Sequence, residues 1–169
     1  LFEMQRNAML MYTSCGWFFD EVSGIETVQI IQYASRALQY AEELKDILLE
    51  PTFLKYLEKA PSNIFKNAAE PYDRHVKSAK TDLLRVAAHY TISSIFEEYP
   101  EDIDIYCYNA KSEIYKRAEA GKLTMVTGKA RLLSRITWDE IIIAFAVVHL
   151  GDHNINAGIK DFPGEKDFS

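Results

Sequence analysis

Hydrophobic residues near the start of the chain recur at the spacing of three and four residues that is typical of amphipathic helices. Phe2, Met9 and Tyr12 fall near one face of a first helix, which is expected over residues 1–14. Gly16 is expected to end this helix because glycine disrupts the helical pattern.

A second, longer helix is predicted from Ser23 or Gly24 to about residue 49. Ser23 and Glu26 have the spacing of a capping box, in which the hydroxyl and the carboxylate accept from free backbone amides. Glu26 is therefore interpreted as a structural residue, the carboxylate of a capping box, rather than as part of a binding site. The broad apolar face of the helix is formed by Ile25, Val28, Ile31, Tyr33, Leu38, Ala41 and Leu44.

Shorter helical segments follow. Pro51 suits the first turn of one, and Pro61 closes it. The pair Tyr99-Pro100 stops the last one. The expected helices are residues 52–59, about 72–80 and 81–98, with a loop over 62–71.

After Pro100 the pattern changes to the β-branched and aromatic content that favours strands. Short connections between the strands favour an antiparallel meander. Residues 141–148 are apolar on both faces and are expected to form a central strand. Gly128 suggests a bulge, and residues 112–120 fit either a strand or a short helix. The predicted strands are 104–109, 122–134, 137–149 and 155–162.

Helices followed by strands predict the α+β class, with a helical bundle of four to five helices followed by a small antiparallel β-sheet. The change of pattern suggests a helical bundle subdomain over residues 1–100 and an antiparallel β subdomain over 101–169, with one shared core. Leu1 lies within a helical pattern and Ser169 follows a strand-like run. The chain is therefore expected to be a fragment of a larger protein.

Charge and composition exclude several classes of partner. The 169 residues carry a net charge of −6, which argues against nucleic acid. The longest apolar run, residues 141–150, is about half as long as a membrane helix, so no membrane partner is expected. Two cysteines, Cys15 and Cys107, are too few for a zinc site or a disulfide framework. We therefore expect a cytoplasmic protein without a cofactor.

The most unusual stretch joins the first two predicted helices. Trp17, Phe18 and Phe19 crowd a short glycine-bounded break and are followed by Asp20 and Glu21. Rings of this size normally become buried. Aromatic residues beside carboxylates suit the face of a sugar, and the alternative is a plug that fills the core.

A second polar candidate is His149-Leu-Gly-Asp-His153. Its two imidazoles and Asp152 suggest a polar or metal site, but the spacing matches no strong zinc motif. Asp152 is also a typical turn residue. His89 is expected in the core and His75 in solvent, and no metal ligand set or catalytic residue is assigned.

Several motifs resemble the domain of unknown function 3536, which follows the catalytic domain in proteins similar to glycoside hydrolase family 57. The resemblance covers most of the chain. It rests on Met4-Gln-Arg6, Thr13-Ser-Cys-Gly-Trp-Phe-Phe-Asp20, Val86-Ala-Ala-His-Tyr90 and Ala144-Phe-Ala-Val-Val-His-Leu-Gly-Asp-His-Asn154.

The resemblance implies that a barrel domain carrying both catalytic carboxylates precedes this chain in the same polypeptide. It also implies that Trp17 and Phe18 border the sugar site, with Asp20 bonding a hydroxyl. We therefore expect a non-catalytic accessory domain that completes the wall of the sugar cleft and contacts an oligo- or polysaccharide. The alternative is a purely structural or protein-interaction domain.

Overall fold

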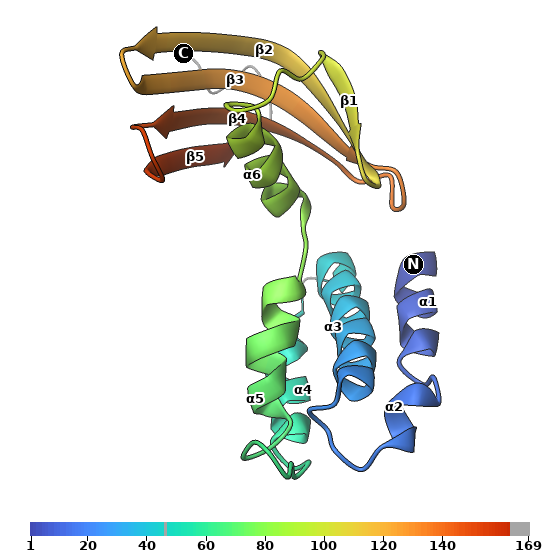
Figure 1. Ribbon diagram of the computed structural model, residues 1–169. Helices are drawn as coiled ribbons and strands as arrows, with labels where there is room; N and C mark the ends of the chain where they lie inside the picture. The colour runs from blue at the N-terminus through green and yellow to red at the C-terminus, as the bar shows by residue number, and fades with distance from the viewer. Residues whose placement is uncertain (46, 163–169) are drawn as a thin grey trace. The chain divides into compact units, whose positions relative to one another are not determined.

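A computed structural model describes residues 1–45 and 47–162 of the chain (Figure 1). The fold is α+β, as predicted: helices come first and an antiparallel sheet follows. The chain divides into two compact units, Leu1–Lys80 and Thr81–Ser169. Each unit has its own buried hydrophobic cluster.

The first unit is helical. The predicted long second helix is confirmed as α3, and α4 has Pro51 in its first turn as expected. A turn of π-helix, Tyr72–Val76, and a short 3-10 helix, Lys77–Ala79, extend α5 into the predicted helical segment 72–80. The α-helices are α1 (Phe2–Leu10), α2 (Cys15–Phe18), α3 (Ile25–Lys45), α4 (Glu50–Leu57) and α5 (Ala69–Pro71).

The core of this unit centres on Tyr72, whose ring is fully buried and packs edge-on against Phe53. A buried hydroxyl must be hydrogen-bonded. The Tyr72 hydroxyl donates to the Glu50 carboxylate at 2.6 Å and lies 3.2 Å from the Ser35 hydroxyl. Lys80 pairs with the same carboxylate at 2.8 Å. These contacts join α3, α4 and the end of the unit.

Two local predictions in this unit are wrong. Gly16 does not end the first helix: α1 stops at Leu10, and Gly16 is buried within the separate helix α2. The capping box of Ser23 and Glu26 does not form, because α3 starts one residue later and the Ser23 amide donates instead to Glu21 at 2.9 Å.

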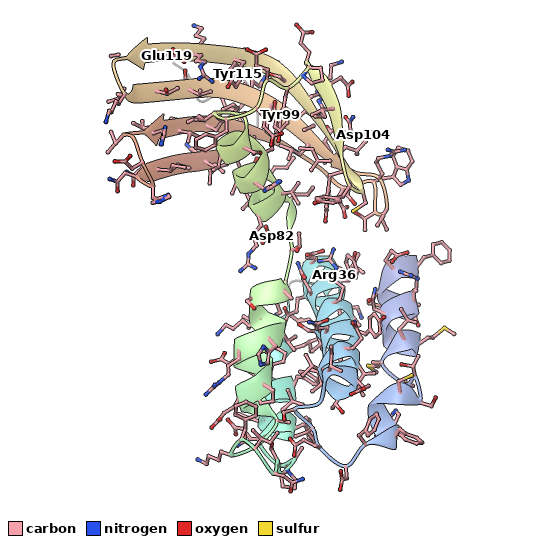
Figure 2. The ribbon with its side chains drawn as sticks, viewed as in Figure 1. Arg36, Asp82, Tyr99, Asp104, Tyr115 and Glu119 are labelled. Carbon is pink, nitrogen blue, oxygen red and sulfur yellow. The ribbon has the colours of Figure 1, made fainter. Side chains whose placement is uncertain are left out.

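The second unit is a five-stranded antiparallel meander in the order β1-β2-β3-β4-β5, with α6 (Leu83–Ser93) against one face (Figure 1). Asp82, labelled in Figure 2, caps α6 by accepting from the Arg85 amide at 2.7 Å. The strands are β1 (Asp102–Ile105), β2 (Tyr108–Ala120), β3 (Leu123–Ser134), β4 (Glu140–His149) and β5 (Ile155–Asp161).

The predicted strand 104–109 is wrong, because the chain reverses inside it. Ile105 pairs with Tyr108, so Tyr106 and Cys107 form a two-residue hairpin turn. The helical alternative for 112–120 is also wrong: this stretch belongs to β2 and pairs with β3. The composition change predicts a division after residue 100, whereas the units divide after Lys80 because α6 packs on the sheet.

Helix α6 ends at Ser93 rather than at the predicted residue 98. Serine hydroxyls that bond to preceding carbonyls compete with helix continuation. The Ser93 hydroxyl donates to the His89 carbonyl at 2.6 Å, and the Ser94 hydroxyl donates to the Thr91 carbonyl at 2.8 Å.

The core of the second unit lies between α6 and the sheet. Residues 141–148 fall in β4, which is paired on both sides as predicted for a central strand. Its inward side chains Ile143, Phe145 and Val147 are buried. The irregularity of register lies in β2, between Ser112 and Ile114, so the bulge predicted at Gly128 is misplaced.

Gly128 is required for another reason. A Cβ atom there would stand 2.7 Å from the Phe145 ring carbon Cζ and still closer to the Ile114 carbonyl oxygen. Such a contact forces backbone or core atoms to move, which typically costs about 1–3 kcal/mol. Gly158, in β5, has open space around it.

We therefore expect Gly128→Ala to lower the free energy of unfolding of the chain by about 1–3 kcal/mol, measured by urea denaturation. The matched strand variant Gly158→Ala should leave it unchanged or slightly raised, because alanine is less costly to order than glycine. Equal stabilities for the two variants would contradict the close approach at Gly128.

Candidate functional site

The aromatic residues of the first unit stand outside its core. Trp17 is 66% exposed and Phe18 is 81% exposed, and Phe19 is also exposed. The rings of Phe18 and Phe19 meet edge-on with their centroids 5.1 Å apart. Asp20 lies beside them and is exposed. Within the first unit these rings therefore do not act as a core plug.

Contacts with α3 hold the segment in place. Gly16 is buried so tightly that a Cβ atom would stand 2.7 Å from Cγ1 of Ile30. The Thr27 hydroxyl lies 3.3 Å from the Gly16 carbonyl and 3.4 Å from the Glu21 carbonyl. The backbone of α2 thus packs on α3 while its aromatic side chains point away from the core.

Glu21 braces the other end of the segment. Its carboxylate accepts from the Ser62 hydroxyl at 2.5 Å and from the Asn63 and Ser23 amides at 2.6 and 2.9 Å. Hydrogen bonds to the ionised form favour it. The bonds from Ser62, Asn63 and Ser23 hold the pKa of Glu21 at about 2, against an ordinary value of 4.5.

The brace changes the roles expected for the carboxylates. Glu21 is occupied by protein donors, which leaves Asp20 as the exposed carboxylate next to the rings. No pattern in the sequence indicates this role of Glu21. Ser62 lies 41 residues away, and a Pro-Ser-Asn loop gives no sign of its partner.

The residues His149, Asp152 and His153 lie at the turn between β4 and β5. The His149 ring nitrogen Nε2 is 3.1 Å from the Asp152 carbonyl oxygen, and the ring packs edge-on against Phe96. Asp152 has a φ of 51°, the left-handed conformation of a turn. Among residues 1–45 and 47–162, no group of three His, Cys, Asp or Glu side chains is placed to hold a metal ion.

The other two histidines, His75 and His89, are both exposed. His75 is exposed, as predicted. His89 was expected in the core but is exposed, because the inward face of α6 is formed by Val86, Ala87 and Tyr90 instead.

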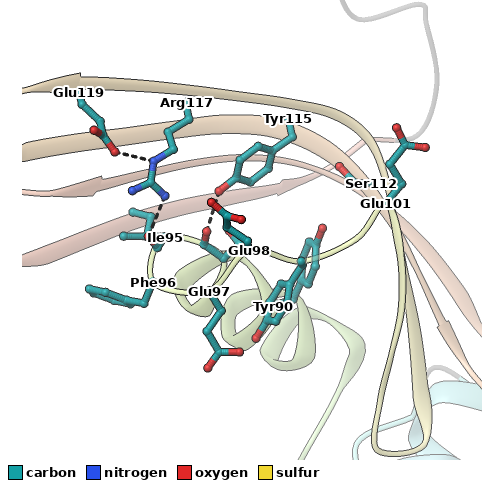
Figure 3. A pocket seen from close by; sticks show the side chains of 12 residues that line it. Tyr90, Ile95, Phe96, Glu97, Glu98, Glu101, Ser112, Tyr115, Arg117 and Glu119 are labelled. Atoms are coloured by element: carbon teal, nitrogen blue, oxygen red, sulfur yellow. Dashed lines mark hydrogen bonds and ion pairs between the residues drawn. The ribbon is translucent and has the colours of Figure 1, made fainter.

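The second unit contains a pocket of about 560 Å³ that no sequence motif indicated (Figure 3). It lies between β2 and the loop that follows α6. The Tyr115 hydroxyl donates to the Ser94 carbonyl at 2.7 Å, and Arg117 donates to the Ile95 carbonyl at 2.8 Å. Arg117 also pairs with Glu119 at 2.7 Å. These bonds fix the loop against the strand.

The lining of this pocket is rich in hydroxyls and carboxylates, with Glu97, Glu98, Glu101 and Glu119 around the single cation Arg117. Such groups can hydrogen-bond a polar ligand. The exposed carboxylates are also ordinary solvated surface groups. The pocket could not be predicted because its wall depends on residues 112–120 forming a strand, and the sequence pattern of this stretch fits a helix as well.

The family model of the domain of unknown function DUF3536 matches residues 1–169. The chain belongs to this family. The comparisons with curated proteins and with solved structures returned no match for the DUF3536 chain. Among its described residues, no helix combines the length and the apolar character needed to cross a membrane.

The brace makes stability depend on pH. Because the pKa of Glu21 is lower in the folded chain than in the unfolded chain, ionised Glu21 stabilises the fold above the unfolded-state value. That contribution is lost as the pH falls from 4.5 towards about 2. We expect Glu21→Gln to lower the melting temperature at neutral pH and to weaken its fall over this acid range.

The control is Asp20→Asn, which removes the neighbouring exposed carboxylate. It should leave the fall of the melting temperature at acid pH unchanged. An NMR titration of the Glu21 carboxyl carbon checks the cause directly. A midpoint near 4.5 would contradict the brace.

Proposed function

We propose that this DUF3536 chain is a non-catalytic accessory domain whose exposed aromatic segment completes the wall of a sugar cleft. The cleft would belong to a preceding catalytic barrel domain of the same polypeptide, similar to glycoside hydrolase family 57. The catalytic carboxylates would come from that barrel. The ligand would be an oligo- or polysaccharide.

One observation carries the proposal: Trp17 and Phe18 are exposed on a backbone that is firmly held at both ends. Contiguous exposed apolar surface on a soluble unit usually marks a binding site. Holding the rings in advance lowers the entropic cost of binding. If the rings were exposed only because the first unit has no core to bury them, their backbone would not have to be ordered. The close packing of Gly16 on Ile30 and the three hydrogen bonds to Glu21 do order it, which favours a role in binding.

The residue types favour a sugar. The indole of Trp17 is a flat apolar surface of the kind that packs on the C–H face of a pyranose, with an N–H at its edge. Asp20 is an exposed carboxylate next to it that can accept from hydroxyl groups. Glu21 serves as the brace and does not contact the ligand.

A second candidate function, docking on another protein domain, is favoured by a separate observation. The exposed apolar surface of the first unit includes further large side chains near the aromatic segment in sequence, namely Phe2, Met9, Tyr12 and Ile25. Large apolar side chains exposed in this number are what a docking surface for another domain requires. We further propose a cytoplasmic location, where Cys15 and Cys107 would remain free thiols.

Trp17→Ala separates the two functions. In the chain alone, removal of an exposed ring should change the free energy of unfolding by less than about 0.5 kcal/mol. In the longer protein we expect KM or kcat for the polysaccharide to change while the melting temperature stays the same. Loss of stability in the longer protein with normal kinetics would contradict the sugar contact and favour docking. Tyr56→Ala, at an exposed ring on α4, is the matched control.

The non-catalytic role is tested with the isolated chain. Purified residues 1–169 should release no reducing sugar from an α-glucan, because the proposal assigns both catalytic carboxylates to the barrel. Measurable turnover that persists through purification and is lost in a variant of this chain would contradict it.

A further inference from the structure

Two hairpin turns meet at one end of the sheet in the second unit. Tyr106 and Cys107 connect β1 to β2, and residues 135–139 connect β3 to β4. The Arg135 amide donates to the Cys107 carbonyl at 2.8 Å. The two turns are therefore fixed side by side.

Each turn contains a large exposed aromatic residue whose backbone conformation is unfavourable for a bulky side chain. Tyr106 is 92% exposed with a φ of 55°, and Trp138 is 74% exposed with a φ of 64°. This left-handed region suits glycine or asparagine, and a bulky residue in it is uncommon. Turns of this kind normally carry glycine at such positions.

Strain of this kind tends to be retained where the side chain has a function. Neither ring can add much to folding, since both are largely in solvent. Two strained, exposed aromatic residues on neighbouring turns are therefore better explained by a ligand than by stability.

Polar side chains beside the turns are already arranged. The Asn109 amide donates to the carboxylates of Asp102 at 2.7 Å and Asp104 at 3.1 Å. Arg135 pairs with Asp104 at 2.6 Å. Asp104, labelled on β1 in Figure 2, is thus held between an amide and a guanidinium two residues before Tyr106.

We propose that these two turns form a binding site for a neutral oligosaccharide of glucose-like sugars. Sugars with equatorial hydroxyls present flat C–H faces that pack on aromatic rings. The Asp, Asn and Arg side chains offer planar pairs of donors and acceptors to neighbouring hydroxyls. Arg135 offsets the charge of Asp104, whereas Asp102 is bonded by the neutral Asn109 amide, so the cluster keeps a negative charge that disfavours an anionic ligand and is compatible with a neutral one. Because the rings stand on two separate turns, a ligand that contacts both must contain more than one sugar unit.

This site is independent of the surface around Trp17, since it lies in the other unit and uses no residue of that segment. The test exploits the two tryptophans of the chain. In a Trp17→Phe background, Trp138 is the only indole. Its fluorescence should change saturably on titration with maltohexaose or cellohexaose. The dissociation constant for glucose should be at least about tenfold higher than that for the hexasaccharide.

Glycine variants separate binding from folding. Tyr106→Gly and Trp138→Gly should each weaken oligosaccharide binding at least about tenfold, measured by calorimetry, while raising the melting temperature by about 2 °C or more because the strain is relieved. Trp138→Phe should keep binding within about fivefold, because an aromatic ring remains. Ile136→Ala, at an exposed residue of the same turn, should bind normally and is the matched control.

Other outcomes overturn the proposal. No saturable response to either hexasaccharide would remove the ligand. A lower melting temperature in both glycine variants would show that the rings serve folding. Concentration-dependent dimerisation that is lost in Trp138→Gly, without sugar binding, would instead make the turns a self-association surface.

Discussion

The exposure of the aromatic segment depends on the carboxylate of Glu21. Three protein donors converge on it and join the stretch before α3 to the loop at Ser62 and Asn63. Hydrophobic burial cannot order a segment whose large side chains remain in water. Charge-assisted hydrogen bonds, which are stronger than neutral ones, take that role here. The packing of Gly16 on Ile30 fixes the other end, so the rings of Trp17 and Phe18 are presented on an ordered backbone.

The same relation recurs in the second unit. At the end of the sheet, Arg135 joins two turns through a backbone bond to Cys107 and an ion pair with Asp104. Tyr106 and Trp138 then remain exposed in conformations that cost free energy, on the order of 1 kcal/mol each. In both units the hydrophobic core lies elsewhere, around Tyr72 in the first and under α6 in the second. The exposed rings are positioned by contacts of the backbone beside them: polar contacts in both units and, in the first, the packing of Gly16 on Ile30 as well.

Much of the fold could be predicted because its signals are local. The apolar periodicity of α3 and the uninterrupted apolar run of β4 identify both elements, and short connections indicate the antiparallel order. The turn at Tyr106 and Cys107 could not be predicted, since it carries none of the usual turn residues. Of the candidate site, Trp17, Phe18 and Asp20 stood out as residue types, but the role of Glu21 depends on a partner 41 residues away. Long-range pairings of this kind leave no periodic pattern in a single sequence.

Trp17 stands in solvent on an ordered segment of the folded chain. Acrylamide quenching of a Trp138→Phe variant, in which Trp17 is the only indole, measures this exposure. We expect quenching to be nearly as efficient as for a free indole in water, while the fluorescence anisotropy stays that of the folded chain. An indole shielded from acrylamide in the isolated chain would contradict the exposure of Trp17, because the ring would then be part of a core.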